Sequence, residues 1–182
     1  VSFLFATPQQ DGGQWDMLCG IIEKYGIVPK SVYPETANAT NSSALNDTLN
    51  TLLRKDGLKL RKLVNSGKSM DEVEAVKSDM LNDVFRILAT SLGLPPKKFN
   101  FEYRDDNKEY HIDKDITPKE FFDKYVGMNL EDHISTINAP TSDKPFHKVF
   151  SVEYLGNVVG GRQVRHLNLT VDEMKDLIIK QL

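Results

Sequence analysis

Residues 45–93 read LNDTLNTLLRKDGLKLRKLVNSGKSMDEVEAVKSDMLNDVFRILATSLG, and this stretch decides most of the fold. Leucine recurs at three- and four-residue spacing in its first half, and valine, methionine and isoleucine do so in its second half. That spacing is typical of helices with one apolar face. Gly67 and Gly93 lie where two such helices should end, and Ser69 with Glu72 forms a capping box between them. We therefore predict two long helices in an antiparallel hairpin.

The first helix of this pair carries many basic residues next to its leucines. They are Arg54, Lys55, Lys59, Arg61, Lys62 and Lys68. The chain has a net charge of −3 and no aromatic residues interleave with this run, so a solvated outer face is favoured over a contact with nucleic acid. A nucleic-acid binder remains an alternative, and its affinity would collapse with salt. Gly57 is expected to weaken this helix from within.

Shorter elements are expected after the helical pair. Alternating aromatic and apolar residues in 99–103 and 110–112 flank the turn residues 105–107, a pattern that predicts a β-hairpin. Thr117 then starts a short helix, with Pro118 at its first position and Gly127 at its end.

The C-terminal third of the chain offers two further signals. Residues 149–154 read VFSVEY, which predicts a strand. Thr170 caps a last helix that runs to Leu182. That uncapped end, together with the absence of an initiator methionine, suggests that the chain is part of a longer protein.

Two adjacent glycines, Gly12 and Gly13, directly precede a helix near the start of the chain. Trp15, Leu18, Cys19 and Ile22 share one face of this helix, which should end at Gly26. Glycines leave no Cβ between the backbone and a visiting molecule, so an extended peptide could hydrogen-bond to the main chain there. Taken alone, a simple turn is the more ordinary interpretation.

Composition sets outer limits on the class of protein. The 182 residues are 40% hydrophobic and 27% charged, which is typical of one globular domain. No apolar run approaches the roughly 20 residues of a membrane helix, so we expect no membrane partner. The fold class that follows is α+β and mostly helical.

Few residues could carry chemistry. Cys19, the single cysteine, lies among apolar residues and is expected to be a buried hydrophobe. The histidines are His111, His133, His147 and His166, and none has the spacing of a metal ligand. The carboxylates Asp105, Asp106, Asp113 and Asp115 lie where turns and solvated faces are expected. We therefore predict no catalytic residue, no metal and no cofactor.

Four Asn-x-Ser/Thr sequences also occur, at Asn38, Asn41, Asn46 and Asn168. No secretion signal precedes them, so we interpret these asparagines as polar turn and helix-start residues rather than glycosylation sites.

The order of several motifs resembles the bleomycin hydrolase and aminopeptidase C family of papain-like cysteine peptidases. The motifs are TPQQDGGQWDM at 7–17, KYGIVPKSVYPE at 24–35, LGLPPKKF at 92–99, ITP at 116–118, FFDKYV at 121–126, NAP at 138–140, KP at 144–145, YLGNVVG at 154–160 and LNL at 167–169. They span essentially the whole chain.

This resemblance implies a fragment of a cytoplasmic, thiol-dependent aminopeptidase that assembles as a homo-hexamer. In the family, the nucleophilic Cys precedes the region matched here and the His and Asn follow it, so no catalytic residue is expected in this chain. The resemblance also implies that Gly12 and Gly13 hold the backbone of a peptide substrate and that Gln14 and Trp15 form the adjacent pocket wall. A non-enzymatic helical interaction module is the alternative.

The same resemblance implies a division of the chain. Residues 1–35 would belong to a partial papain-like core, 36–165 to a helical insertion that builds assembly contacts, and 166–182 to a return to the core.

Overall fold

The computed structural model describes residues 2–10 and 12–182, with Ser2 and Phe3 described by their backbone alone. Val1, and the Asp11 that precedes the paired glycines, lie outside the described residues. The chain divides into two compact units. The first consists of residues 1–12 and 30–96, and the second of residues 13–29 and 97–182. Helices and two small sheets make up these units, which confirms the α+β class.

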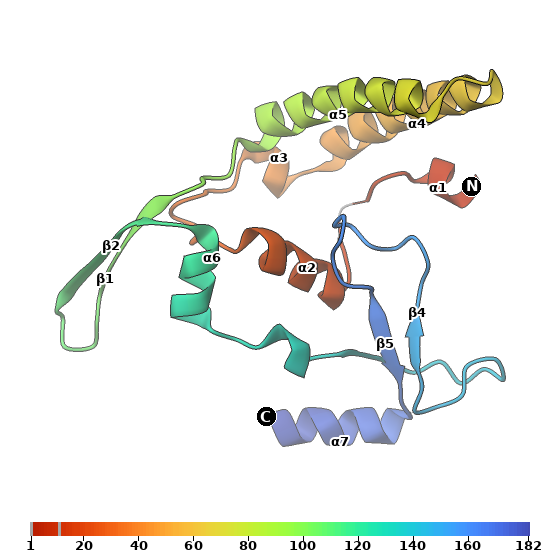
Figure 1. Cartoon of the computed structure of the whole chain (residues 1–182). Helices are drawn as coiled ribbons and strands as arrows, with labels where there is room; N and C mark the ends of the chain where they lie inside the picture. Colours follow the sequence, from red (N-terminus) through yellow and green to blue (C-terminus); the bar gives the residue numbers. More distant parts are fainter. Residues whose placement is uncertain (1, 11) are drawn as a thin grey trace. The chain divides into compact units, whose positions relative to one another are not determined.

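The first unit is built on the predicted helical hairpin, which Figure 1 shows as two long antiparallel helices. Helix α4 covers Ser43–Asn65 and α5 covers Met70–Leu92. Leu45 and Leu49 of α4 and Val73 and Met80 of α5 are buried, as the apolar spacing requires. The capping box at the start of α5 is present, because the Ser69 hydroxyl accepts from the Glu72 amide and the Glu72 carboxylate accepts from the Ser69 amide.

Two short helices complete the first unit. Helix α3 (Ala37–Thr40) lies at the end of α5, where the Tyr33 hydroxyl and the Thr36 hydroxyl donate to the carbonyls of Leu92 and Ser91. Helix α1 covers Ser2–Ala6 and packs on α4. The carbonyl groups at the end of α5 are therefore satisfied by side chains from the preceding connection.

The basic face of α4 is exposed, as predicted, and two of its arginines also contact α1. Arg54 donates from Nε to the carbonyl of Phe5 at 2.9 Å and from Nη2 to the carbonyl of Ala6 at 2.7 Å. The Arg61 guanidinium lies 5.0 Å from the centre of the Phe5 ring. Both arginines remain exposed, which agrees with the expected solvated face, and they also attach α1 to α4.

The second unit contains the predicted β-hairpin. Strand β1 (Phe99–Arg104) pairs antiparallel with β2 (Tyr110–Ile116), with an irregularity between Phe99 and Phe101. Helix α6 (Pro118–Phe121) follows and continues as a π-helix over Phe122–Val126, which ends at Gly127 with φ 59°. The ring of Phe101 lies 4.8 Å from that of Phe121, so an aromatic cluster joins the hairpin to the helix.

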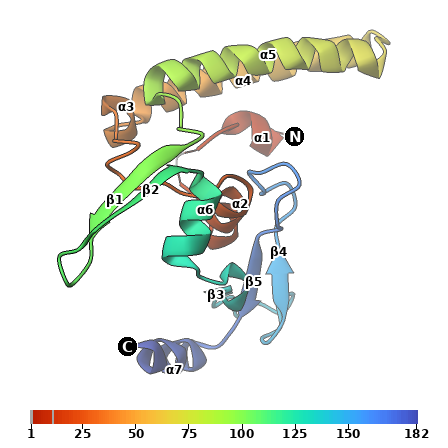
Figure 2. The same ribbon diagram turned by 60° about the vertical axis from the view of Figure 1, so that its left-hand side comes forward.

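A three-stranded sheet and a last helix complete the second unit (Figure 2). Strand β5 (Arg165–Asn168) lies between β3 (Ser135–Ile137), which is parallel to it, and β4 (Val149–Ser151), which is antiparallel. Helix α7 covers Val171–Gln181 and begins at the predicted Thr170 cap.

The strand predicted over 149–154 is shorter than expected. It ends at Ser151 because β5 offers only residues 165–167 as partners. Tyr154 then adopts φ 62° with 86% of its surface exposed, a left-handed conformation that cannot continue a strand.

The asparagines of the four Asn-x-Ser/Thr sequences make internal hydrogen bonds. Asn168 is fully buried, and its side-chain amide donates to the carbonyls of Ala139 and Lys144 at 3.1 and 2.8 Å. Its carbonyl oxygen accepts from the Ala139 amide. The side-chain amide of Asn38 donates to the carbonyl of Ser91. The side-chain oxygen of Asn41 accepts from the Ser43 backbone amide at the start of α4. These contacts agree with the structural interpretation of those residues.

Helix α2 (Trp15–Tyr25) carries the small core of the second unit. Cys19 and Ile22 are buried together with Leu130. Leu130 begins a turn of 3-10 helix, η2, over Leu130–Asp132. Gly26 ends α2 as predicted, with φ 77°, and a Cβ there would lie 2.2 Å from the carbonyl carbon of Pro118. Only glycine therefore allows α2 and the start of α6 to approach this closely.

Among the described residues, no helix combines the length and the apolar character that crossing a bilayer would require. The boundaries of the two compact units differ from the expected division at residues 35 and 165. That expected division concerns a core and an insertion within a longer protein, and it stays a prediction.

Candidate functional site

The paired glycines form a stretch of bare main chain before α2. Both are exposed, and Gly12 adopts φ 122°, a conformation that side chains other than glycine rarely adopt. A Cβ on Gly12 would meet nothing within 4 Å, and one on Gly13 would lie 3.1 Å from the Met17 sulfur. Within residues 2–10 and 12–182, neither glycine takes part in a hydrogen bond. A role of Gly12 and Gly13 in holding a peptide stays a prediction.

Gln14 and Trp15 follow at the start of α2. Gln14 is exposed and lies at the N-cap, where its amide contacts the Met17 sulfur at 3.4 Å. Trp15 is half-buried and packs on the Cys19 core, with its ring centre 5.8 Å from that of His133. We name residues Gly13–Trp15 the α2 lip.

The Trp15 indole has one unusual property. Its Nε1 is buried but has no hydrogen-bond partner in the described part of the chain. A buried indole N–H is normally paired, because leaving it unpaired costs free energy. The ring therefore holds a donor for which the described residues provide no acceptor.

No nucleophile lies at the α2 lip. Cys19 is fully buried, which confirms the structural role predicted for it. Burial raises the pKa of its thiol, while the charge of Arg162 opposes this change. A thiol in such surroundings is not activated for attack.

A buried ionic cluster contains Asp16, the residue that follows the α2 lip in the chain. This cluster was not predicted from the sequence. Asp16 has no exposed side-chain surface and Arg162 has only 8%. Arg162 Nη1 lies 3.3 Å from Asp16 Oδ1, and the same guanidinium binds both carboxylate oxygens of Glu23. The Arg165 amide donates to Asp16 Oδ2 at 2.7 Å. We name Asp16, Glu23, Glu131, Arg162 and Arg165 the α2 ion cluster.

Hydrogen bonds within this cluster stabilise the positive charge of Arg162. Burial acts to lower the pKa of the Arg162 guanidinium, but the hydrogen bonds to Glu23 and Asp16 outweigh burial and raise that pKa. Arg162 and Arg165 also bind the two oxygens of Glu131, at 2.7 and 3.3 Å. The cluster therefore joins three segments of the second unit, namely α2, η2 and the connection that enters β5.

A sequence signal for the cluster did exist. Asp16 and Glu23 are seven residues apart, so they lie on one face of α2 together with the buried Cys19. Acidic residues near a helix start are common on solvated faces, which made this pair inconspicuous. Leu18, which was expected on the buried face, is instead 48% exposed, whereas Asp16 is buried.

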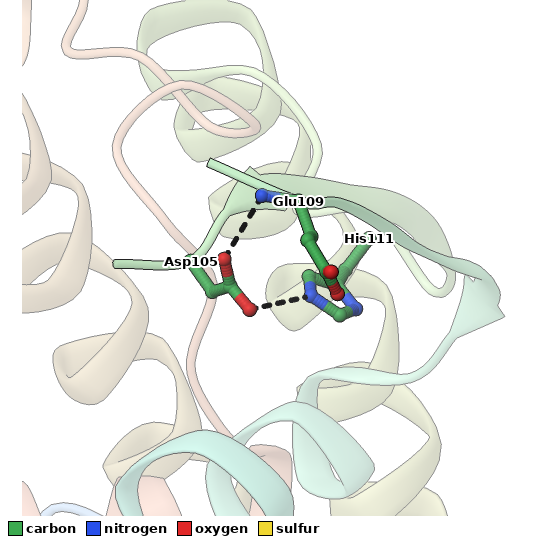
Figure 3. Close-up of side chains that lie close together, drawn as sticks. All are labelled: Asp105, Glu109 and His111. Carbon is green, nitrogen blue, oxygen red and sulfur yellow. Dashed lines mark hydrogen bonds and ion pairs between the residues drawn. The ribbon is translucent and has the colours of Figure 1, made fainter. Parts of the chain in front are cut away.

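A second group of titratable side chains lies at the turn of the β-hairpin (Figure 3). Asp105 Oδ2 lies 3.2 Å from His111 Nε2, and one ligand atom from each of Asp105, Glu109 and His111 falls within 4.8 Å of the others. Asp105 Oδ1 also accepts from the amides of Asn107 and Glu109 at 2.9 Å. The bond with His111 is the main cause that lowers the pKa of Asp105.

These contacts explain the hairpin cluster as a turn. The Asp105 carboxylate supplies the acceptor that the backbone amides of the turn would otherwise lack. This agrees with the turn role expected for Asp105. One oxygen of Asp105 is therefore already occupied by the amides of the turn. The absence of a metal site stays a prediction.

The other histidines lie apart from one another. His147 Nε2 is 2.7 Å from Glu173 Oε1, at the start of α7. His133 lies beside Trp15, and His166 is in β5 with a buried Nδ1 that has no hydrogen-bond partner in the described residues. The structure brings none of these three into a group with metal-ligand geometry in the described part of the chain.

Comparison with known proteins places this fold and these motifs in a family. The model of the peptidase C1-like family matches residues 1–182, and the chain therefore belongs to that family. Aminopeptidase C from Lactobacillus helveticus is 89% identical over 182 residues, which are 100% of this chain and 40% of that protein. Bleomycin hydrolase from Homo sapiens is 41% identical over 180 residues, which are 98% of this chain and 40% of that protein.

A solved structure gives the same result. The crystal structure of PepW from Lactobacillus rhamnosis HN001 matches with a TM-score of 0.96 and 63% sequence identity, and it covers 100% of this chain and 41% of that chain. The chain thus spans about two fifths of the length of these relatives. The resemblance to the bleomycin hydrolase and aminopeptidase C family is confirmed.

Proposed function

We propose that this chain is part of a cytoplasmic cysteine aminopeptidase that removes N-terminal residues from peptides. Membership of the peptidase C1-like family and the names of the relatives, Aminopeptidase C and bleomycin hydrolase, support this proposal. The chain would supply one edge of the substrate cleft, while the nucleophilic thiol and its histidine and asparagine partners lie on other polypeptide.

The observation that carries the proposal is the bare main chain at Gly12 and at Gly13, the first residue of the α2 lip. Gly12 and Gly13 are exposed and have peptide groups without hydrogen bonds in the described residues. An extended substrate would pair its backbone with Gly13 in the manner of an added strand. Trp15 would then form the wall beside the first side chains of the substrate.

In the whole enzyme, the thiolate sulfur would attack the carbonyl carbon of the first peptide bond. The imidazolium partner would give its proton to the departing amine, and water would then hydrolyse the acyl-enzyme. The contribution of this chain is orientation, because a substrate held in the reactive geometry reacts with a smaller loss of entropy.

The test compares this chain with the full-length protein that contains it. Using an aminoacyl amide as substrate, we expect thiol-dependent turnover by the full-length protein and none by the purified chain. Turnover by the purified chain would show that it holds its own catalytic residues, and no turnover by the full-length protein would disprove the peptidase assignment.

A matched pair of variants tests the α2 lip. In the full-length protein, Gly13→Ala places a methyl group between the backbone and the substrate, so we expect KM to rise about tenfold through loss of one or two hydrogen bonds. Gly156→Ala is the control, because a Cβ there meets nothing within 4 Å. Equal KM values for the two variants would contradict the role of the α2 lip.

Assembly contacts are the second role expected of this chain, and one observation favours the helical hairpin for them. The α4–α5 hairpin exposes Leu58, Leu81 and Phe85 by 50 to 59%. We propose that this surface contributes to the homo-oligomer, with a hexamer expected for the full-length protein. Light scattering on full-length wild-type and Phe85→Ser protein tests this, and an unchanged mass for Phe85→Ser would remove the hairpin from the assembly.

A further inference from the structure

We infer that Arg162 and Asp16 are positioning residues that set the place of the α2 lip, an inference that rests on the proposed substrate cleft. Neither side chain belongs to the residues expected to contact a peptide. Both lie in the second unit, and Asp16 follows Trp15 directly in the chain. Their role follows from how α2 begins and from what holds its first turn.

The start of α2 has a weak local cap, because its capping box pairs Gln14 with Met17 and the acceptor for the Gln14 backbone amide is a thioether sulfur. Its N-cap is Gln14, which is not among the preferred capping residues, and the two preceding glycines are the most flexible residues available to a chain. Neither glycine is held by a hydrogen bond within the described residues. A helix end of this kind frays unless tertiary contacts hold it.

Asp16 provides that tertiary contact. Its carboxylate, next in the chain after Trp15, receives the Arg165 amide at 2.7 Å and Arg162 Nη1 at 3.3 Å. Arg162 lies in the connection before β5 and Arg165 is the first residue of β5, so the two donors are 146 and 149 positions away from Asp16 along the chain. The first turn of α2 is thus fixed by a distant segment, and the direction of the α2 lip is fixed with it.

Arg162 holds α2 at more than one place. Its guanidinium binds Asp16 in the first turn and Glu23 two turns later, and it also contacts Glu131 Oε1 at 2.7 Å in η2. A planar guanidinium with five donors can make these contacts together, whereas a lysine ammonium cannot. This geometry prevents α2 from tilting and from sliding along its axis.

The fluorescence of Trp15 can report the position of the α2 lip. Trp15 is the single tryptophan of the sequence and lies within the α2 lip, next to Asp16. Its fluorescence emission therefore reports the surroundings of the α2 lip without interference from other indoles. Displacement of the first turn would expose the half-buried ring to water and shift its emission to longer wavelength.

The test uses Arg162→Lys, because this variant keeps the positive charge beside buried Asp16 where Arg162→Met could fail to fold. In the purified chain we expect a red shift of Trp15 emission. In the full-length protein we expect kcat/KM for an aminoacyl amide to fall roughly ten- to a hundredfold, mainly through KM, as for other small displacements of a binding group.

Asp113→Asn is the matched control for lost stability. Asp113 accepts from Lys124 and from the Tyr125 hydroxyl, both at 2.6 Å, in the same unit but on the β-hairpin. We expect this variant to lower the melting temperature while Trp15 emission and KM stay as in the wild type. Parallel changes in KM for both variants would reduce Arg162 to a purely structural role and overturn the inference.

Two further outcomes separate the inference from the proposed function. Unchanged Trp15 emission in a folded Arg162→Lys chain would overturn the inference whether or not the protein is a peptidase. Absence of any turnover by the wild-type full-length protein would instead overturn the proposed function, and the emission measurement would still decide whether Arg162 places the α2 lip.

Discussion

Single buried polar residues organise the second unit. Asn168 and Asp16 are its fully buried polar side chains in the described residues, and each joins segments far apart in the sequence. A buried polar group is tolerated only when its hydrogen bonds are made, so such a residue accepts few alternative arrangements of its neighbours. These two residues therefore specify the fold of their surroundings more narrowly than apolar residues of the same size would.

Asn168→Ala should be among the most destabilising substitutions in the second unit. It removes donors to Ala139 and Lys144 and leaves the Ala139 amide without its acceptor. We expect a loss of about 2–4 kcal/mol of unfolding free energy, the range for a broken buried hydrogen-bond network. Urea denaturation measures it, and exposed Asn157→Ala serves as a control with little effect. Similar midpoints for both variants would contradict the structural role of Asn168.

At the scale of elements, side-chain caps decide where three helices begin. Ser69, Thr117 and Thr170 each accept from the amide of an acidic residue three positions later, and that residue's carboxylate accepts from the cap amide. These boxes are local, which is why the sequence predicted all three helix starts. Helix α2 has only a box of weak capping residues, Gln14 and Met17, and we infer that it depends on the α2 ion cluster as well.

The caps predict an acid-dependent loss of helix. Bonds from Lys68 and Ser69 lower the pKa of Glu72 from 4.5 to about 2, and bonds from Thr170 and His147 do the same for Glu173. A depressed pKa in the folded state stabilises the fold above the ordinary pKa, and this contribution is lost as the pH falls from about 4.5 to about 2.

Far-UV circular dichroism between these pH values measures this loss. Both carboxylates are exposed, so the effect should be small and should weaken with added salt. The double variant Glu72→Gln/Glu173→Gln cannot titrate at these positions and should lose less helix over the same range. Identical curves for the variant and the wild type would contradict the assignment.

Helix α1 depends on a glycine in its partner helix. A Cβ on Gly57 would lie 2.9 Å from the Phe5 ring, so Gly57→Ala should displace α1 although alanine favours the helix itself by about 1 kcal/mol. In a Phe5→Ala background the same substitution should become stabilising. A double-mutant cycle in urea measures the coupling, and an equal effect of Gly57→Ala in both backgrounds would show that Phe5 does not contact this position.

At the scale of the whole molecule, the chain consists of two compact units with separate cores. The longest helices, α4 and α5 with 23 residues each, belong to the first unit, whereas Trp15 belongs to the second. Circular dichroism therefore reports mainly the first unit, and tryptophan fluorescence reports only the second.

We expect these two signals to change at different urea concentrations. Non-coincident transitions are the mark of unfolding that is not two-state, which separate cores permit. Asn168→Ala should move the fluorescence transition more than the circular dichroism transition, and Met80→Ala, in the core of α4 and α5, should do the reverse. Coincident transitions that move together in both variants would show that the units unfold as one.

Local sequence patterns were sufficient to predict the hairpin of α4 and α5, the pairing of β1 with β2 and the capped helix starts. They also predicted the helix ends at Gly26, Gly93 and Gly127. Each depends on residues within a few positions of one another, so periodicity and capping chemistry reveal it. The motif order likewise indicated the family and pointed to Gly12, Gly13, Gln14 and Trp15 as the candidate substrate edge.

Contacts between residues far apart in the sequence could not be predicted from local patterns and became visible only in the folded chain. Strands β3 and β5 are three and four residues long and form because distant segments meet, and β4 ends where its partner ends. The α2 ion cluster joins Asp16 to Arg162 and Arg165 across most of the chain, and the spacing of Asp16 and Glu23 alone cannot be told from that of a solvated helix face. The helices follow from neighbouring residues, whereas the support of the α2 lip follows from desolvated charges that find partners only after folding.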